Sequence, residues 1–358
     1  MELRACGTTG LQLSALGLGC WQFGGGAYWG ESDQQTVTTL VHTAVDSGLT
    51  YFDTAEMYNE GRSEEFLGKA LKGIPRDRVV VGSKVWPTNM HPTTLREHCE
   101  ASLKRLDMDY VDIYMLHWPL NPRTYPLFAD TSRTGLSGTG DNTLDAPLLE
   151  DVVAMLLQLQ QEGKIRHLGL SNYGTERLRE IQQIGGTYVV NQIIYNLITR
   201  AAEIEVLPFC QQAGIGTIAY LVLMQGILTD KYATLDDIPD WYIRTRHFSS
   251  QRTPKSRHGG PGAEAELIQA LQGIRSLAAE CDCTTAELAL KWTVANPDLT
   301  CALAGTQNIE RLKANIEAVE APLSADVLER LNTITQPLKE KLGPGLDLFE
   351  SVENDRTR

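Results

Sequence analysis

The sequence predicts an α/β fold in which eight parallel strands close into a barrel with helices outside. Two observations carry this prediction. From Ala15 onward, short apolar β-rich runs alternate with helical segments, and eight such pairs can be counted. Repeated strand-then-helix units imply parallel strands covered on both faces, and eight of them can close a (β/α)8, or TIM, barrel. Several of the runs also end in a titratable residue, and barrels of this type keep their sites at the strand ends. An open, doubly wound sheet is the alternative.

The elements follow from local pattern. Asp33 or Ser32 is suited to cap the first helix, and Gly48 to end it. The expected strands are 15–20, 50–53, 79–84, 110–117, 165–171, 187–191, 216–220 and 300–304. The expected helices are 33–47, 63–72, 93–106, 148–162, 175–184, 202–213, 263–295 with a break near Asp282, and 309–334.

We expect one domain over residues 1–358, because no linker or internal repeat divides the chain. Turn residues Gly7-Thr-Thr-Gly10 between β-compatible flanks predict an N-terminal hairpin over 1–14. The barrel is expected over 15–335, and a polar C-terminal tail over 336–358. Two long loops interrupt the rhythm after strands four and seven, at 118–146 and 228–262, and loops of that length in a compact fold are usually functional or disordered.

Composition excludes several classes of function. The formal charge of −13 argues against general binding to nucleic acid or to an anionic membrane, because like charges repel. No run of 18 apolar residues is present, and the N-terminus lacks a signal pattern. Seven scattered cysteines fit reduced thiols and a cytoplasmic protein, and the close pair Cys281-Asp-Cys283 is weak evidence for a metal, so none is expected.

Polar groups at strand ends suggest a catalytic constellation. The stretch Thr50–Asn59 starts with β-formers, presents Asp53 and then Tyr58 five residues later. The next two strands end in Lys84 and His117. Because the carboxyl ends of parallel barrel strands meet at one face, we expect the four side chains to lie together.

At this point the chain resembles the aldo-keto reductases, from the hairpin to about Asn315 and more loosely beyond. The matching motifs are Asp53-Thr-Ala-Glu-Met-Tyr58, Lys84, Leu116-His-Trp-Pro119, Gly169-Leu-Ser-Asn172, Asn191-Gln-Ile-Ile-Tyr-Asn196, Gly226-Ile-Leu-Thr-Asp-Lys-Tyr232 and Gly305-Thr-Gln-Asn-Ile-Glu-Arg-Leu-Lys-Ala-Asn315. The resemblance implies a barrel that binds a nicotinamide cofactor and reduces an aldehyde or ketone reversibly.

The resemblance also implies a catalytic tetrad of Asp53, Tyr58, Lys84 and His117. Carbonyl reduction needs a hydride for carbon and a proton for the developing alkoxide. Tyr58 would give the proton, and His117 would hydrogen-bond and orient the carbonyl. A neighbouring Lys84 ammonium, held by Asp53, is expected to lower the pKa of the Tyr58 phenol.

Cofactor residues carry over from the same motifs. Ser171, Asn172 and Gln192 resemble the group that hydrogen-bonds the nicotinamide carboxamide, and Tyr220 resembles the aromatic that stacks on the ring. The segment Gly305–Asn315 resembles the adenosine end of such a site. There the backbone of Gly305 and Thr306 would suit a phosphate, and Arg311 and Asn315 would face the adenine and ribose.

The cofactor is expected to be NADPH, with NADH possible. Many relatives have Arg or Lys where Gln307 stands, and this neutral amide weakens the argument for a 2′-phosphate, which leaves Arg311 to bind it. Relatives often continue Ser-Pro-Leu after the position of Tyr220, where this chain has Leu221-Val-Leu223. The missing hydroxyl suggests that backbone donors or the arginines of the 244–257 region contact the pyrophosphate instead.

The substrate is expected to be a small carbonyl compound, in a pocket walled by Trp21, Trp86 and Trp118. An alternative keeps cofactor binding without much turnover, as in redox-sensing subunits of larger assemblies. A phosphate-binding lyase or isomerase is a third reading, against which Asn172 and Gln192 argue. The oligomeric state is not predicted.

Overall fold

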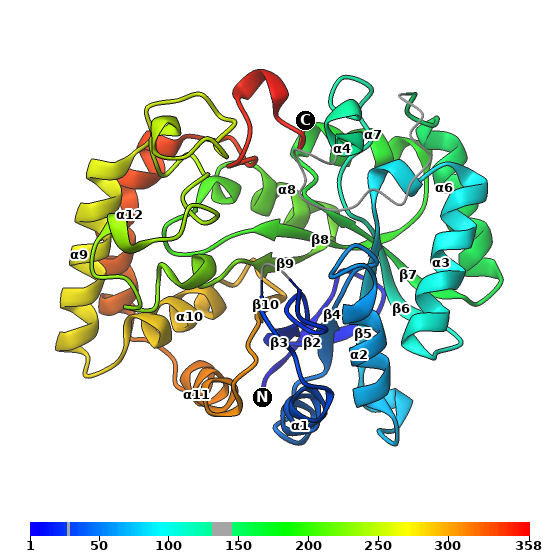
Figure 1. The fold of residues 1–358 in the computed structure, drawn as a ribbon, viewed down its shortest axis with the longest axis horizontal. Helices are drawn as coiled ribbons and strands as arrows, with labels where there is room; N and C mark the ends of the chain where they lie inside the picture. Colours follow the sequence, from blue (N-terminus) through cyan, green and yellow to red (C-terminus); the bar gives the residue numbers. More distant parts are fainter. Residues whose placement is uncertain (27–28, 131–144) are drawn as a thin grey trace.

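The computed structural model describes residues 1–26, 29–130 and 145–358. A two-stranded antiparallel hairpin precedes a closed barrel of eight parallel strands (Figure 1). The hairpin strands are β1 (Leu3–Ala5) and β2 (Gln12–Ser14). The barrel strands are β3 (Leu16–Gly19), β4 (Tyr51–Asp53), β5 (Val80–Val85), β6 (Val111–Leu116), β7 (Ile165–Ser171), β8 (Tyr188–Ile194), β9 (Gly216–Tyr220) and β10 (Cys301–Ala304).

The barrel closes where β10 pairs with both β9 and β3, all in parallel. The remaining strands pair in chain order from β3 to β9. Closure confirms the predicted TIM barrel and rules out the open doubly wound sheet. The expected hairpin is also confirmed, with Leu3 opposite Ser14.

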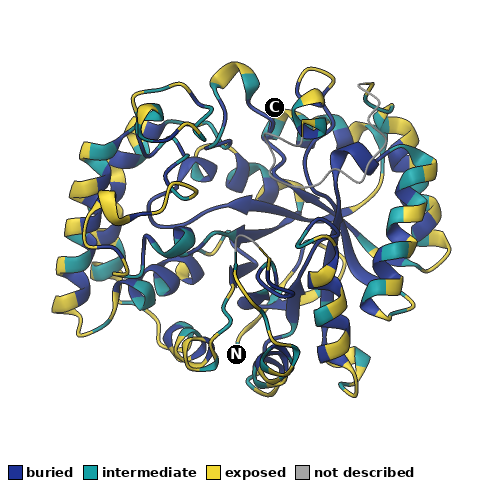
Figure 2. Cartoon of the chain, in the orientation of Figure 1, coloured by how far each residue is buried: buried dark blue, intermediate teal, exposed yellow. Residues whose placement is uncertain are grey.

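Helices cover the outside of the barrel, with their apolar faces turned inward (Figures 1 and 2). Asp33 caps α1, where its carboxylate accepts a hydrogen bond from the Thr36 amide at 2.7 Å. The helices are α1 (Gln34–Asp46), α2 (Arg62–Leu71), α3 (Pro92–Leu106), α4 (Pro126–Ala129), α6 (Leu149–Gln161), α7 (Thr175–Ile184), α8 (Val206–Ala213), α9 (Glu264–Glu280), α10 (Thr285–Ala295), α11 (Ile309–Glu320) and α12 (Ala325–Leu342). In the part of the chain that the structure describes, none of these is long and apolar enough to cross a membrane.

Most element bounds agree with the sequence to within two residues, and three do not. β8 continues three residues past the expected end at Asn191, because the apolar pair Ile193-Ile194 stays in the barrel wall. The helix expected from Ala202 begins with a 3₁₀ turn, and α8 starts only at Val206. The last helical region, expected as one stretch over 309–334, is two helices: α11 ends at Glu320, and α12, capped by Ser324, begins at Ala325 and runs on through Pro337 to Leu342.

The C-terminal tail therefore begins after Leu342, and it packs back onto the barrel. Asp347 and Arg356 are both buried and form an ion pair, with Arg356 Nε 2.7 Å from Asp347 Oδ2. The Gly174 amide, which follows β7, donates to the Thr357 carbonyl at 2.9 Å. A tail that looked merely polar in sequence thus crosses the upper side of the molecule in Figure 1.

The two expected long loops are present. The segment after β6 includes α4, a single helical turn that the Pro- and Gly-rich sequence did not predict. Residues 131–144 of this segment lie outside the described part of the chain. The segment after β9 runs from Leu221 to Ala263 and contains only 3₁₀ turns.

Candidate active site

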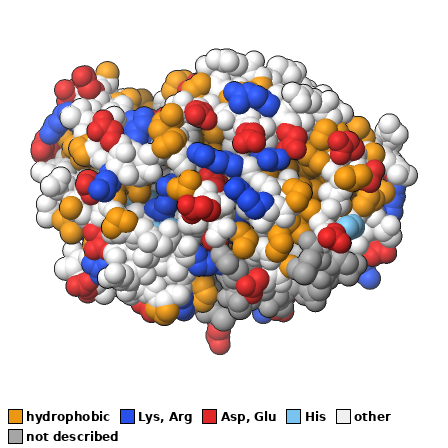
Figure 3. Space-filling view, turned by 90° about the horizontal axis from the view of Figure 1, so that it is seen from above, with side chains coloured by type: hydrophobic (Ala, Val, Ile, Leu, Met, Phe, Trp, Pro, Cys, Tyr) orange, Lys and Arg blue, Asp and Glu red, His pale blue; other side chains and the backbone are white. Residues whose placement is uncertain are grey.

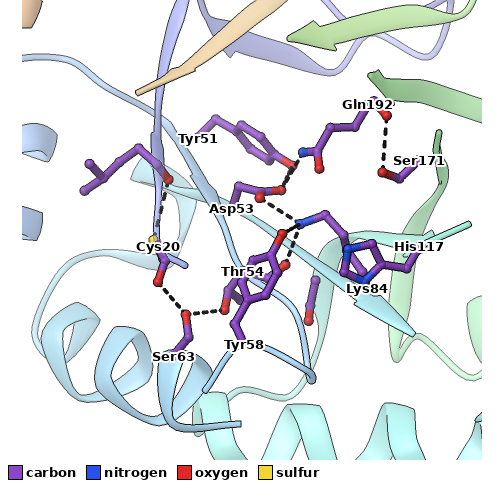
Figure 4. Close-up of polar contacts among 12 residues, drawn as sticks. Cys20, Tyr51, Asp53, Thr54, Tyr58, Ser63, Lys84, His117, Ser171 and Gln192 are labelled. Atoms are coloured by element: carbon purple, nitrogen blue, oxygen red, sulfur yellow. Dashed lines mark hydrogen bonds and ion pairs between the residues drawn. The ribbon is translucent and has the colours of Figure 1, made fainter. Parts of the chain in front are cut away.

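Four predicted residues meet at the carboxyl ends of three neighbouring strands (Figure 4). Asp53 is the last residue of β4, Lys84 lies in β5, and His117 directly follows β6. Tyr58 stands in the loop between β4 and α2 and faces the same point. The strand order β4-β5-β6 makes these three strand ends adjacent.

Lys84 is the centre of the group. Its ammonium donates to Asp53 Oδ2 at 2.7 Å, to the Thr54 carbonyl at 2.9 Å and to the Tyr58 hydroxyl oxygen at 3.2 Å. The Lys84 side chain is 1% exposed and that of Asp53 5%, so the pair is shielded from water. A buried charge pair of this kind holds its geometry because every departure leaves a charge uncompensated.

Burial, with Asp53 as the second cause, raises the pKa of the Tyr58 phenol well above its ordinary value. This direction is opposite to the one expected from Lys84 alone. The physical reason is that Asp53 cancels much of the Lys84 charge, while the low-polarity surroundings disfavour a phenolate. Burial also lowers the pKa of Lys84, against the opposing effect of Asp53. Tyr58 is therefore a neutral phenol at neutral pH and holds the proton that a reduction would use.

His117 is a neutral imidazole. Burial, with the Lys84 charge second, lowers its pKa well below the ordinary value. Its ring lies edge-on to Tyr58 at 5.8 Å between centroids and to Trp86 at 5.3 Å. Among the described residues, the buried Nδ1 atom of His117 has no hydrogen-bond partner. The His117 imidazole thus packs against the Tyr58 phenol, whose hydroxyl lies beside the Lys84 ammonium.

The four residues predicted to bind the nicotinamide lie beside the tetrad, and hydrogen bonds connect them with one another. Ser171 Oγ donates to the Gln192 carbonyl at 3.2 Å, and the Asn172 amide donates to the His117 carbonyl at 3.0 Å. Tyr220, at the end of β9, donates its hydroxyl proton to Asn172 Oδ1 at 2.6 Å. The Gln192 side chain donates to Asp53 Oδ1 at 2.7 Å, so this group and the tetrad form one network.

Asn172 has a left-handed backbone, with φ of 64°, which few residues other than glycine adopt. The strained turn places its amide between His117 and Tyr220 instead of pointing along the strand. Strain of this kind persists only where neighbouring contacts enforce it, and it is common at functional sites.

The segment Gly305–Asn315 follows β10 and leads into α11. Gly305 lies so close to Gln22 that a Cβ there would approach the Gln22 side-chain amide to 2.8 Å. Asn308 caps α11 by accepting from the Arg311 amide at 2.9 Å. Gln307 donates to the Gln22 carbonyl at 2.8 Å. Gly305 is nevertheless exposed, and the backbone before α11 lies at the positive end of a helix, which suits an anion.

Arg311 and Asn315 project from α11 one turn apart, and Arg311 is exposed. Within the described part of the chain, neither side chain makes a hydrogen bond with the tetrad. The predicted site residues therefore form two groups: a buried group at the ends of β4–β8, which includes the tetrad, and an exposed group on α11.

Aromatic side chains border the tetrad, and together they are called the aromatic wall below. Trp86 and Trp118 are buried in one cluster with Met57 and Phe128. Trp21 stands on the Tyr58 side, with its ring 5.8 Å from the Tyr58 ring. The three tryptophans predicted for the pocket therefore flank Tyr58 and His117.

Sequence reasoning missed two members of this wall. Phe128 belongs to α4, in a segment without helical periodicity, and its ring lies 5.8 Å from that of Trp118. Arg356 comes from the tail, and its guanidinium stacks 4.1 Å above Trp118. A lone aromatic in a Pro-rich loop and an arginine two residues from the end carry no local signal that would single them out.

A third missed residue, Glu56, fastens the Tyr58 loop to the loop after β5. Its buried carboxylate accepts hydrogen bonds from the Trp86 amide and the Asn89 side chain, both at 2.8 Å, and from His98 Nδ1 at 2.6 Å. The signal was present in the motif Asp53-Thr-Ala-Glu-Met-Tyr58, but only the structure shows which partners the glutamate has.

The basic residues of the loop after β9 are largely engaged by the protein itself. Arg252 pairs with Glu264 and Asp236, Arg257 pairs with Glu350, and Arg246 donates to tail carbonyls. In Figure 3, which looks onto the upper side of Figure 1, Lys and Arg side chains gather near the centre with acidic side chains among them. These contacts favour a structural role for the arginines over the suggested contact with a pyrophosphate.

The fold and this cluster define a barrel with a Tyr–Lys–Asp–His site at the carboxyl ends of its strands. Residues 15–336 match the sequence model of the Aldo/keto reductase family. The chain belongs to that family.

Individual proteins with similar sequences support this family assignment. The Escherichia coli (strain K12) protein named NADH-specific methylglyoxal reductase is 34% identical over 337 residues, 89% of this chain and 93% of its own length. Aldo-keto reductase YhdN of Bacillus subtilis (strain 168) is 30% identical over 355 residues, 96% of this chain and 97% of its own.

Solved structures give the same result. A Klebsiella pneumoniae aldo-keto reductase in complex with NADPH has a TM-score of 0.67 at 27% identity, covering 99% of this chain and 98% of its own. A thermostable aldo-keto reductase in complex with the inhibitor epalrestat has a TM-score of 0.70 at 28% identity, covering 93% and 100%.

Proposed function

We propose that this protein is an NAD(P)H-dependent carbonyl reductase in which Tyr58 donates the proton. The observation that carries the proposal is the buried chain Asp53–Lys84–Tyr58, with its hydroxyl at 3.2 Å from the ammonium and His117 facing it. A bound nicotinamide cofactor supplies the hydride. The protein's own part is to hold the carbonyl, exclude water and move one proton.

His117 and Tyr58 divide the work at the carbonyl oxygen. Neutral His117 can donate a hydrogen bond to that oxygen without adding a second cation next to Lys84. As carbon is reduced, the oxygen becomes an alkoxide, which is a much stronger base than a phenolate. Tyr58 therefore gives up its proton even though burial raises its pKa, and Lys84 stabilises the phenolate that results. The same groups in the opposite protonation states would oxidise an alcohol.

The residues around the tetrad fit a dinucleotide. We assign Ser171, Asn172, Gln192 and Tyr220 to the nicotinamide, because their polar atoms border Asp53 and His117. Gly305 and Thr306 would take a phosphate at the start of α11. Gln307, Arg311 and Asn315 would lie along the adenosine.

The preferred cofactor is NADPH, with exposed Arg311 as the partner of the 2′-phosphate. NADH is the second candidate, because Gln307 is neutral and its amide is already bonded to the Gln22 carbonyl. The relative from Escherichia coli is named NADH-specific, which keeps this candidate open.

The first test is a fluorescence titration with NADPH and with NADH, on the wild type and on Tyr58→Phe, followed by turnover on small aldehydes that include methylglyoxal. We expect both proteins to bind the cofactor and only the wild type to turn over. Failure to bind either nucleotide would overturn the proposal. Binding without turnover on any carbonyl would favour a redox-sensing subunit instead.

A further inference from the structure

Tyr51 is a buried titratable residue directly beneath the tetrad that the proposed mechanism does not use. It lies two residues before Asp53 in β4, so both side chains point to the same side of the strand, into the barrel. Its hydroxyl donates to Asp53 Oδ1 at 3.1 Å (Figure 4).

The strands on both sides of β4 make room for this ring. Gly17 in β3 and Gly82 in β5 flank it, and a Cβ at Gly17 would approach Tyr51 Cδ1 to 3.0 Å. A Cβ at Gly82 would collide with the Tyr51 hydroxyl oxygen itself. A larger residue at Gly82 would displace the phenol from Asp53, and one at Gly17 would press on the edge of its ring. The slot is therefore shaped for a tyrosine, and not only for an apolar filler.

The surroundings of the Tyr51 ring are otherwise apolar. It is fully buried in a cluster inside the barrel with Ile113, Met115 and Cys301. The titratable groups facing the hydroxyl are Asp53 from its own strand, Cys301 from β10 and Cys6 from the hairpin. Burial, with Asp53 second, raises the pKa of Tyr51 well above its usual value, so the hydroxyl keeps its proton and acts as a donor.

The two carboxylate oxygens of Asp53 are thereby given different partners. Oδ1 accepts from the two neutral donors, Tyr51 and Gln192, and Oδ2 accepts from the Lys84 ammonium. We propose that Tyr51 is a positioning residue that fixes the Asp53 carboxylate from below, so that Lys84 is aimed at the Tyr58 oxygen. This inference rests on the proposed function of the tetrad.

The consequence for chemistry has a definite sign. A donor to Asp53 disperses part of its negative charge, and that charge is one of the causes that raise the pKa of Tyr58. Without the Tyr51 hydroxyl, Tyr58 should become a weaker acid. Proton donation should slow, while substrate binding, which Tyr51 does not touch, should change little.

The test compares Tyr51→Phe with Tyr114→Phe. Each variant removes one hydroxyl from a fully buried tyrosine in a barrel strand, β4 for Tyr51 and β6 for Tyr114. Among the described residues, the Tyr114 hydroxyl has no hydrogen-bond partner, and its ring packs in the outer core instead of under the tetrad. Thermal melting establishes that each variant is folded.

In Tyr51→Phe we expect kcat for aldehyde reduction to fall about tenfold with little change in KM, the size expected for one lost hydrogen bond to a charged group. The alkaline limb of the kcat profile should move to higher pH. In the protein without cofactor, the ionisation of Tyr58, followed by NMR of ring-labelled tyrosine and assigned with Tyr58→Phe, should move in the same direction. Tyr114→Phe should match the wild type in all three.

Replacement of Tyr51 by 3-fluorotyrosine keeps the ring and makes the hydroxyl a stronger donor, so it should move the Tyr58 ionisation to lower pH. The proposal is overturned if Tyr51→Phe and Tyr114→Phe agree in kcat profile and in Tyr58 ionisation, with the wild type active. A wild type that reduces no carbonyl would instead overturn the proposed function, and the cofactor-free ionisation would still decide the role of Tyr51.

Discussion

The ends of β4–β6 and the segment Gly305–Asn315 both lie at the carboxyl end of the barrel, yet they are built in different ways. At the first, every member of the Asp53–Lys84–Tyr58 chain is joined to the next within 3.2 Å, and the ion pair is almost fully buried. At the second, Arg311 is exposed and Asn308 serves only to cap its own helix.

Under the proposed function, this difference matches two tasks: proton transfer at the first region and binding of the adenosine end of the cofactor at the second. Groups that move a proton must be aligned before the reaction, and a buried network supplies that alignment at all times. A surface that binds phosphate or ribose can leave its charges in water until the ligand arrives, since strongly hydrated exposed groups cost the fold little. Substitutions that remove a charge from the first region should therefore affect both stability and turnover, and loss of an uncharged hydroxyl there should affect mainly turnover. Substitutions at the second region should affect only affinity.

The sharpest test of the prearranged region is Tyr58→Phe. Loss of the phenolic proton should reduce kcat by about 10²–10⁴-fold, the usual range for a general acid. The fold and the cofactor affinity should change little, because the half-buried hydroxyl contacts only Lys84 among the interactions described above. Steady-state kinetics and the NADPH titration together measure both. Retention of more than a tenth of the turnover would show that the proton comes from elsewhere.

The second test, Lys84→Met, addresses stability as well as activity. Removal of the ammonium leaves Asp53 buried beside two neutral donors, and breaking a buried pair in this way costs about 3–5 kcal/mol of unfolding free energy. Urea denaturation measures the loss. The matched control is the double variant Asp53→Asn/Lys84→Met, which removes both charges and should regain part of the lost unfolding free energy. Equal stability of the single and double variants would argue against a tight pair.

A third test concerns the long loop after β9, which lies outside both compared regions but contains a buried titratable ring. His247 is fully buried there and contacts the Ile198 carbonyl through Nε2 at 2.8 Å. Burial lowers its pKa from 6.5 to about 4. Above pH 6.5 the ring is neutral in both folded and unfolded states, so it has no effect on the pH dependence of stability.

Between pH 6.5 and 4 only the unfolded chain takes up a proton on His247, so stability falls as the pH falls, by about 3 kcal/mol in all. The measurement is the unfolding free energy across this range for the wild type and His247→Gln, with His42→Gln on the exposed face of α1 as the control for the substitution. If the unfolding free energy falls with pH equally steeply in all three proteins, the lowered pKa of His247 is contradicted.

The smallest effect is expected at the exposed end. Arg311→Ala should weaken NADPH binding about fivefold and leave NADH binding unchanged, since one exposed contact to a phosphate is worth about 1 kcal/mol. Isothermal titration with both nucleotides measures the difference. Lys313→Ala, on the same helix, should affect neither. An equal loss for both nucleotides would place Arg311 away from the 2′-phosphate.

The local sequence sufficed for much of this molecule. Alternating strands and helices predicted the closed barrel, and Asp33 and the strand 165–171 were placed correctly because capping and β-rich runs depend on near neighbours. Asp53, Tyr58, Lys84 and His117 could be expected to lie together because parallel strands bring their carboxyl ends to one face, whatever the details of packing.

Only the tertiary structure decided the rest. The direction of the Tyr58 pKa depends on burial and on how far Asp53 cancels Lys84, and neither can be read from spacing. Phe128 and Arg356 join the pocket wall from segments without periodicity, and α12 passes through Pro337 because Leu338 and Leu342 continue its buried face. Tyr51 looked like one more apolar strand residue, and it became a partner of Asp53 because glycines on two neighbouring strands leave it room. Local interactions can be read along the chain, whereas desolvation and contacts between distant segments exist only once the chain has folded.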